Sequence, residues 1–516
     1  MIGKRGAVAT SQPQSVLAGM EMFLHGGNAV DAALASAVSL CVLEPVSNGI
    51  GSDAFAIVWD GRPVGLNASG KSPAGLDVSL LEGATSFPEL GWLPVTVPGA
   101  VSAWIALWRR YGSLSLEVIF APAIRYAEEG FALTPHTALA WGRAASRFRV
   151  LAQDLQASFF ASFFPDGFQP RPGALFRNPD QARTLREIAK TQGESFYRGA
   201  LAQQMVLFSK KTGGFLSLED LGNHKPLWVE PLSMDYRGVT VYELPPNGQG
   251  LASLLALGIL SNLNLSRYPR ESAESYHLQI EAMKLAFDET RSRIADPEMD
   301  LPDPRGLLVS EHLTQRASLI QGQARPLEGA IPLYPGGTVY LATADKELQV
   351  SFIQSNYQGF GSGVVIPRTG IAMQNRGACF TLMPGHPNAV APGKRPYHTI
   401  IPSFLAKNGE PLGPFGVMGG PMQPQGHLQV IVNLVDYGMD PQTALETPRW
   451  KVLDGAHILL ESTVPRSVAL ALQDKGHAVG MSADPAEFGK GQVILQEDQV
   501  FFAGTDPRAD GLALAW

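Results

Sequence analysis

The sequence predicts an α+β fold, in which helices dominate the ends and strands the middle of each half of the chain. Residues 29–43 are small and apolar nearly all round, as in a helix buried between layers. Residues 339–344 are largely apolar on both faces at period two, as in a strand covered on both sides. Residues 55–66 consist of two apolar runs around Asp60-Gly61, which is typical of a hairpin. Periodicity establishes only this mixture, and a four-layer αββα sandwich with sheets packed face to face fits it.

The first elements have clear boundaries. Asn28 is a good N-cap, and Asp31 lies three residues on, where a capping acid belongs. Pro45 ends the helix, because its ring cannot continue a helical backbone. Residues 55–59 and 63–66 then form the two arms of the hairpin.

The middle of the chain alternates helical and extended patterns. Apolar residues recur at helical spacing in 101–131, 179–207 and 276–295, and residues 231–244 alternate like a pair of strands. The Pro- and Gly-rich run 164–173 predicts a surface loop. Residues 308–335 show no clear period, so we expect an exposed tether there.

The last third opens with the buried strand that begins at Thr338. A turn at residues 345–347 separates it from a second strand at 349–354. Residues 413–420 predict a glycine-rich loop. Further helices are expected from His427 onward and at 465–473.

Composition limits the classes of function. The chain has 516 residues, 45% of them hydrophobic and 17% charged, which suits a large core and argues against disorder. A formal net charge of −7 and the lack of Lys- and Arg-rich runs argue against a nucleic-acid partner. Two cysteines, Cys41 and Cys379, exclude a disulfide scaffold, and no Cys/His spacing predicts a metal site. We expect neither a metal nor a cofactor.

The sequence also predicts a cytoplasmic protein with no membrane partner. No stretch reaches about 18 consecutive apolar residues, the length that a spanning helix requires. The N-terminus runs into residues 7–10 without the apolar segment of a secretory signal.

Residues 65–72 match the P-loop pattern G-x-x-x-x-G-K-S. A working P-loop needs a parallel strand before it and a helix after it. Here the preceding strand is the second arm of the expected hairpin, and Pro73 follows at once. We therefore do not expect nucleotide binding.

The junction Gly336-Gly337-Thr338 carries a chemical possibility. The glycine pair makes the peptide bond before Thr338 sterically open. If the chain cuts itself there, the Thr338 hydroxyl becomes a nucleophile and its freed α-amine, a group whose pKa is ordinarily roughly 7.7–8.0, becomes the base. An ordinary loop-to-strand junction has the same local sequence, so both interpretations stay open on these residues alone.

Motifs along almost the whole chain resemble the gamma-glutamyltransferase family, in the family's order and from about residue 5 to residue 510. Before Thr338 they are residues 26–33, 44–45, 49–51, 97–99, 121–124, 196–199 and 219–221; after it they are 360–363, 391–396, 419–420 and 438–441.

The resemblance implies an N-terminal-nucleophile hydrolase with the four-layer αββα sandwich. A precursor of this kind cleaves itself into a large subunit, here 1–337, and a small subunit, here 338–516, which together build one core; a dimer of such pairs is a further option. Thr338 is then the nucleophile, Gly419 and Gly420 form the oxyanion hole, and Ser355 takes the place of a threonine that hydrogen-bonds the nucleophile. Asn375 also matches the family pattern.

The residues that grip a glutamyl group depart from the family. Ser69 stands where the family has a carboxylate-binding arginine, with Lys71 two residues away, and His398 and Thr399 replace a pair of serines. Arg376 and Cys379 replace the two acceptors of the α-ammonium, and arginine cannot accept a hydrogen bond. Tyr357 replaces an asparagine. The cutting residues are kept while substrate recognition has changed.

We therefore expect an enzyme that hydrolyses or transfers an acyl group from a small-molecule donor through a threonyl ester. A gamma-glutamyl donor such as glutathione is the default expectation, because residues 374–377 match a subgroup labelled gamma-glutamyltransferase-like. The alternative is an amidase or acylase for another carboxylate-bearing acyl group, of glutaryl or cephalosporin type, since Arg376, Lys71 and His398 suit an anion without a nearby ammonium. An inactive scaffold is a second alternative.

Overall fold

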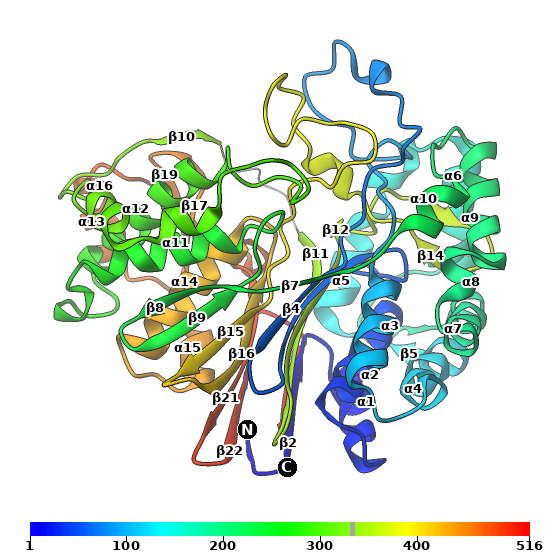
Figure 1. The fold of residues 1–516 in the computed structure, drawn as a ribbon, viewed down its shortest axis with the longest axis horizontal. Coiled ribbons are helices and arrows are strands. Elements are labelled where there is room, and N and C mark those ends of the chain that lie inside the picture. Colours follow the sequence, from blue (N-terminus) through cyan, green and yellow to red (C-terminus); the bar gives the residue numbers. More distant parts are fainter. Residues whose placement is uncertain (331–335) are drawn as a thin grey trace.

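Two seven-stranded antiparallel sheets stand face to face between layers of helices (Figure 1). The computed structural model describes residues 1–330 and 336–516. Sheet one has the order β1 (Ile2–Gly3), β22 (Val500–Thr505), β21 (Lys490–Glu497), β16 (Glu410–Met418), β15 (Ser403–Lys407), β9 (Val239–Glu243), β8 (Leu232–Tyr236). Sheet two has the order β23 (Leu512–Ala515), β2 (Gly6–Thr10), β11 (Gly336–Asp345), β12 (Gln349–Gln358), β3 (Asp53–Trp59), β4 (Pro63–Asn67), β7 (Leu227–Val229).

Each sheet has its own helical cover, on opposite sides of the molecule in Figure 1. Sheet two packs on helices from the first part of the chain: α1 (Pro13–Leu24), α2 (Ala29–Leu43), α3 (Ala100–Tyr111), α4 (Leu116–Glu129), α5 (Pro135–Ala144), α6 (Gln153–Phe163), α7 (Pro179–Thr191), α8 (Glu194–Tyr197), α9 (Ala200–Lys211) and α10 (Leu218–Asn223). Sheet one packs on α11 (Gly250–Ser261), α12 (Ala273–Thr290), α13 (Ser310–Ala317), α14 (Met422–Val435), α15 (Pro441–Glu446) and α16 (Arg466–Asp474).

Short strands form smaller sheets around this core. They are β5 (Phe131–Ala132) with β6 (Leu175–Phe176), β10 (Leu327–Ala330) with β18 (Asp454–Gly455), β13 (Val365–Ile366) with β14 (Ile371–Ala372), and β17 (Trp450–Val452), β19 (His457–Glu461) and β20 (Ala478–Ser482). Among the described residues, no helix has the length and apolar character that a membrane crossing requires.

Strand β11 lies at the centre of the sandwich. Tyr340, Ala342 and Ala344 face sheet one in the core between the sheets, whereas Val339 and Leu341 face the helices. All five side chains are buried, which confirms the prediction of a strand covered on both faces.

The predicted α+β sandwich is confirmed, with two antiparallel sheets inside and helices outside. Both parts of the chain on either side of Thr338 contribute strands to both sheets. The expected capping box is also present, because Asn28 accepts from the Asp31 backbone while the Asp31 carboxylate accepts from Asn28 N. The hairpin of β3 and β4 forms as predicted, so the P-loop-like run follows an antiparallel arm.

Several predictions of irregular structure and of boundaries were wrong. Residues 413–420 are not a loop, because β16 continues to Met418; a side chain at Gly416 would lie 2.5 Å from the Tyr340 ring, so glycine there permits close sheet packing. The predicted tether at 308–335 contains α13 and β10 within its described part, and residues 331–335 lie outside the described residues.

Helix boundaries also differ from the predictions. Helix α14 begins at Met422 rather than His427. The helical stretch 101–131 is two helices, α3 and α4. The stretch 179–207 is three, α7 to α9.

Candidate active site

Three polar residues stand in register across neighbouring strands at one end of sheet two. Thr338 of β11 pairs with Ser355 of β12, and Ser355 pairs with Asp53 of β3. Directly opposed residues in antiparallel strands project from the same face of the sheet. All three side chains are buried. Strand register therefore brings together residues that lie far apart in the sequence.

The strand pair is irregular at the peptide bond before Thr338. Gly337 opposes Tyr357 and Thr338 opposes Ser355, so the register shifts at Asn356. Tyr357 has a φ of 75°, a left-handed conformation that is uncommon for a residue with a side chain. Bulges of this kind re-aim groups near functional sites. Here the Gly337 carbonyl accepts a hydrogen bond of 2.6 Å from the Ser355 hydroxyl.

The Ser355 hydroxyl is a hub of hydrogen bonds. Besides donating to Gly337 O, it lies 2.9 Å from Thr338 Oγ1 and accepts from Tyr357 N at 2.8 Å. Arg376 Nη2 also donates to it at 3.3 Å. Because the single Ser355 proton is used on Gly337 O, the Thr338 hydroxyl is the donor in the Thr338–Ser355 pair. This arrangement brings the predicted nucleophile, its partner and the carbonyl of the predicted cleavage site together.

Arg376 is a fully buried cation beside this hub. Its Nη1 donates to Thr399 Oγ1 at 2.7 Å, and its guanidinium lies 4.5 Å from the centre of the Tyr357 ring. Nη1 also lies 3.8 Å from Cys379 Sγ. Its Nε is buried without a hydrogen-bond partner, and no described carboxylate forms an ion pair with it. The guanidinium thus keeps capacity for an anion.

Gly419 and Gly420 form the turn after β16 and lie against the chain just before Thr338. A Cβ atom at Gly336 would lie 2.9 Å from Gly420 N and 3.3 Å from Gly419 Cα. Gly419 has a φ of 140° and Gly420 a φ of 58°, so this turn also favours glycine for its backbone angles. The backbone of the predicted oxyanion hole is therefore close to the bond that the sequence marks for cleavage.

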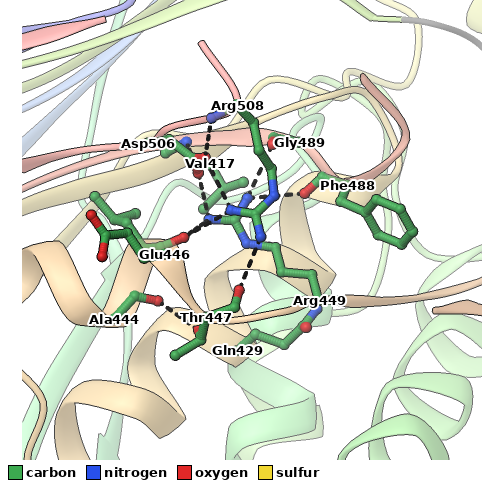
Figure 2. A network of polar contacts seen from close by, with 12 residues as sticks. Val417, Gln429, Ala444, Glu446, Thr447, Arg449, Phe488, Gly489, Asp506 and Arg508 are labelled. Carbon is green, nitrogen blue, oxygen red and sulfur yellow. Dashed lines mark hydrogen bonds and ion pairs between the residues drawn. The ribbon is translucent and has the colours of Figure 1, made fainter. Parts of the chain in front are cut away.

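A buried network of charges holds the segment behind this turn (Figure 2). Arg449 donates to the carbonyls of Phe488 and Gly489 at 2.9 and 3.0 Å, and pairs with Asp506 at 2.6 Å. Arg508 pairs with the other oxygen of Asp506 at 3.1 Å. Gly489 in turn packs on Gly419, since a Cβ atom at Gly419 would lie 3.0 Å from Gly489 Cα. The network thereby positions the turn.

His398 is placed beside the site but is engaged by protein groups. Its Nε2–H donates to Asp53 Oδ2 at 3.1 Å, and its Nδ1 accepts from Ile400 N at 3.4 Å. Burial, followed by the charge of Arg376, lowers the pKa of His398 well below its ordinary value. Burial raises the pKa of Asp53 to about 7. His398 is therefore a neutral, packed histidine in the uncut chain, not a free anion-binding group.

Two more of the predicted binding residues, Ser69 and Lys71, are also engaged by protein groups. The Ser69 hydroxyl donates to Asn67 Oδ1 at 2.7 Å. Lys71 is partly exposed and pairs with Glu298 at 2.5 Å. The expectation that Lys71 helps to bind an anion with Arg376 is thus not supported by its contacts, because a carboxylate already neutralises it.

Asn375 supports the end of β12. Its Oδ1 accepts from Gln358 N at 3.1 Å, and its Nδ2 donates to Glu89 O at 3.0 Å. Sequence reasoning gave no role to Asp53 or to Arg395, although Arg395 lies in the family motif at 391–396; Arg395 is buried, donates to Ser69 O and pairs with Glu298. Strand register reveals Asp53.

Two cavities adjoin the site. One of about 300 Å³ is lined by Thr338, Gly336 and Gly419. A larger cavity of about 1240 Å³ is lined by Tyr357, Cys379 and Thr399, the residues that contact Arg376. The site therefore has space at Thr338 and separate space beside Arg376.

A histidine pair elsewhere was not foreseen from spacing. His277 and Glu281 lie one turn apart on α12, and their ligand atoms and those of His477 lie within 4.8 Å of one another. The Lys284 ammonium, however, lies 2.9 Å from Glu281. Since a cation already neutralises this carboxylate, the described residues give weak support for a metal there.

Comparison with known proteins places this geometry in context. The gamma-glutamyltranspeptidase family profile matches residues 15–516. The glutathione hydrolase-like YwrD proenzyme of Bacillus subtilis is 34% identical, over 100% of this chain and 99% of its own length. The oxamate amidohydrolase proenzyme of Klebsiella pneumoniae is 34% identical, over 98% of this chain and 96% of its own. The crystal structure of cephalosporin acylase from Bacillus halodurans is 49% identical, with a TM-score of 0.96 over 100% of this chain and 96% of that one.

Proposed function

The chain belongs to the gamma-glutamyltranspeptidase family, and on that premise we propose that it is a self-processing amidohydrolase for short acyl groups that carry an anion but no α-ammonium. One observation carries the proposal. Arg376 is a buried cation that forms no ion pair among the described residues, and a single serine hydroxyl separates it from the Thr338 hydroxyl. Its charge acts on Asp53 without direct pairing, and its buried Nε has no hydrogen-bond partner among the described residues, so the guanidinium keeps donor capacity that points to a ligand anion at this position.

The same residue disfavours a gamma-glutamyl donor. Such a donor brings an α-ammonium, which needs acceptors. Arg376 offers only donors, and Cys379 offers at best a weak acceptor. The names of two similar proteins agree with this preference, since oxamate is a short anion without an ammonium and one similar solved structure is a cephalosporin acylase. The name of the glutathione hydrolase-like relative favours the gamma-glutamyl donor instead.

Self-cleavage begins at the bond before Thr338. The Thr338 hydroxyl attacks the Gly337 carbonyl carbon, and Ser355 is placed to donate to the carbonyl oxygen as it gains charge. The Gly337–Thr338 C–N bond breaks, the threonine nitrogen takes the proton, and an ester forms. Water then hydrolyses this ester. The products are a segment 1–337 with a new carboxylate and a segment 338–516 with a free α-amine.

Turnover repeats the chemistry on an external amide. The Thr338 amine accepts the hydroxyl proton, the hydroxyl attacks the substrate carbonyl, and the same proton leaves with the departing amine. Gly419 and Gly420 backbone N–H groups supply donors for the oxyanion. The resulting acyl ester is hydrolysed by water.

A panel of 4-nitroanilides tests the proposed acyl specificity. It contains oxalyl, succinyl, glutaryl and adipyl anilides, the gamma-glutamyl anilide, and a neutral butyryl anilide as the uncharged match. The proposal expects the highest kcat/KM among the shorter diacid anilides, because one serine spans the distance from Thr338 to Arg376. A higher kcat/KM for the gamma-glutamyl anilide than for the glutaryl anilide would overturn it in favour of glutathione-type donors.

A further inference from the structure

The cavity of about 300 Å³ that Thr338 lines shares no lining residue with the larger cavity beside Arg376 within the described chain. Strand β11 is flanked by β12 on one side and by β2 on the other, and β16 is flanked by β15 and β21. Ser355 lies on β12. Its hydroxyl accepts a hydrogen bond from Arg376, which also donates to Thr399. The cavity of about 300 Å³ is lined by Ser11 and Gln12, which follow β2, by Lys490, which begins β21, and by Gly359, which follows β12.

This arrangement offers a separate cavity for each half of an amide substrate. An amide carbon bound at Thr338 carries its acyl chain toward Arg376 in the proposed function, so the separate cavity at Thr338 is left for the amine half. Thr338 and Gly336 both line the cavity, so it is continuous with the position of the Thr338 nitrogen.

The acidic groups of this cavity already have partners. Glu44 is buried and accepts from the hydroxyls of Ser11 and Ser47, each at 2.7 Å. Burial raises the pKa of Glu44, against the opposing charge of Lys490. The two oxygens of Asp510 accept from the first backbone N–H groups of α5, His136 N and Thr137 N, each at 3.0 Å.

Two of the basic groups that line the cavity also have partners, and Lys490 does not within the described parts of the chain. Arg143 pairs with Asp484 at 3.5 Å, and Arg147 pairs with Glu89 at 3.1 Å. The Lys490 ammonium forms no hydrogen bond or ion pair with any residue in 1–330 or 336–516, and its half-buried side chain lines the cavity. Its backbone is fixed, because β21 pairs with β16 at Met418 and the Arg449 network holds Gly489 next to it (Figure 2).

We propose that this cavity binds the amine half of the substrate, and that Lys490 selects amines that carry a carboxylate or a similar anion. The inference rests on the proposed amidohydrolase function and deepens it, since it makes the substrate an amide with an anion on each side of the bond. The volume suits an amine of the size of an amino acid or an aminobenzoate and is at the lower limit for larger ligands. The same pocket would receive an acceptor amine if the acyl group is transferred.

The test compares two leaving groups on one acyl group. Glutaryl 4-nitroanilide and its 3-carboxy derivative differ by one carboxylate on the amine half. Wild-type enzyme should show a kcat/KM about ten-fold higher for the carboxylated anilide, the size expected of one charge-assisted hydrogen bond. In Lys490→Met this ratio should fall to about one, and Lys490→Arg should restore most of it. Lys346→Met, at the exposed turn beyond the far end of β11, is the matched control and should keep the wild-type ratio.

A binding measurement separates this inference from the proposed function. Calorimetric titration of the wild-type protein with 5-amino-2-nitrobenzoate and with 4-nitroaniline measures binding of the two amines and needs no turnover. Tighter binding of the carboxylated amine, lost in Lys490→Met, supports the pocket even if no anilide is hydrolysed, in which case only the proposed function fails. Equal kcat/KM values for both anilides with no binding of the carboxylated amine overturn the pocket and leave the amidohydrolase function standing.

Discussion

The hydroxyl of Thr338 lies 2.9 Å from the hydroxyl of Ser355, and the same serine donates to the carbonyl of Gly337. A nucleophile, a hydrogen-bond donor and the carbonyl of the bond to be cut therefore meet at one serine. Strand pairing holds the two hydroxyls together, because Thr338 and Ser355 are opposed in the β11–β12 ladder.

Replacement of Thr338 by alanine should abolish both cleavage and turnover, because it removes the attacking oxygen. Mass spectrometry of wild-type protein should show fragments of 337 and 179 residues (516 − 337 = 179), and Edman sequencing of the shorter one should read Thr-Val-Tyr-Leu. Thr343→Ala on the same strand is the control and should still be cut, since the Thr343 hydroxyl donates to Ala29 O and has no contact with the cleavage site among the described residues. Amidase activity in Thr338→Ala would place the nucleophile elsewhere.

Replacement of Ser355 by alanine should slow cleavage by about 10²- to 10³-fold, the usual effect of losing one donor to a developing oxyanion. The half-life of the full-length chain on a denaturing gel measures it. Ser355→Thr keeps a hydroxyl and should be cut faster than Ser355→Ala. Ser351→Ala, a buried serine on the same strand, is the control; equal half-lives for Ser351→Ala and Ser355→Ala would remove Ser355 from the mechanism.

Replacement of Arg376 by methionine should lower kcat/KM for glutaryl 4-nitroanilide by about 10- to 100-fold, because a charge-assisted contact to the acyl carboxylate is lost. The neutral butyryl anilide should be affected much less, so the ratio of the two kcat/KM values is the readout. Arg305→Gln, an exposed residue paired with Asp303, serves as the control. An unchanged ratio in Arg376→Met would mean that the anion is bound by another group.

Acid should weaken the junction between the segments 1–330 and 336–516 at His277 and His477. Their rings share a hydrogen bond of 2.8 Å, and burial lowers the pKa of His477 to about 3 and also lowers that of His277. In the unfolded chain these two histidines bind protons near pH 6.5, whereas in the folded chain their lowered pKa values keep them neutral. The free energy of unfolding is therefore unaffected by them above about pH 6.5 and falls as the pH is lowered below it.

Urea midpoints at pH 7, 6 and 5 check this expectation. Wild-type protein should lose about 1.4 kcal/mol per pH unit more than His477→Gln between pH 6 and pH 5, for each proton that the folded state excludes. If the free energy of unfolding depended on pH in the same way in both proteins, protonation of His477 would not destabilise the fold.

Replacement of Arg449 by methionine should destabilise the fold by about 3–5 kcal/mol, because Asp506 loses one of its two buried partners. It should also lower turnover, because Gly489 supports Gly419. Thermal unfolding and anilide hydrolysis measure the two effects. Arg183→Met, at an exposed pair on α7, should shift neither; a wild-type rate in Arg449→Met would separate the network from the glycine turn.

Much of the fold was predictable from local pattern. The capping box at Asn28 and Asp31, the β3–β4 hairpin and the doubly covered strand β11 all follow from residues close in sequence, and all are confirmed. The predicted glycine-rich loop at 413–420 was wrong, because Gly416 lies within β16 and packs against the ring of Tyr340 from the other sheet. Such a contact has no local signature.

The candidate site divides in the same way. Motif order indicated Thr338, Ser355, Gly419 and Gly420, and the structure brings them together, although their catalytic roles stay predictions. The structure does not support the expected anion-binding roles of His398 and Lys71, because each is already held by a carboxylate.

By itself, the sequence determined which elements form and which threonine follows an open glycine pair, since these depend on neighbours along the chain. Only the tertiary structure decided which charges are free to act. Within the described parts of the chain, Arg376 and Lys490 form no direct ion pair, whereas Lys71 and His398 each contact a carboxylate, and the partners come from distant strands and loops. Charge pairing is a property of packing, and a sequence pattern cannot show it.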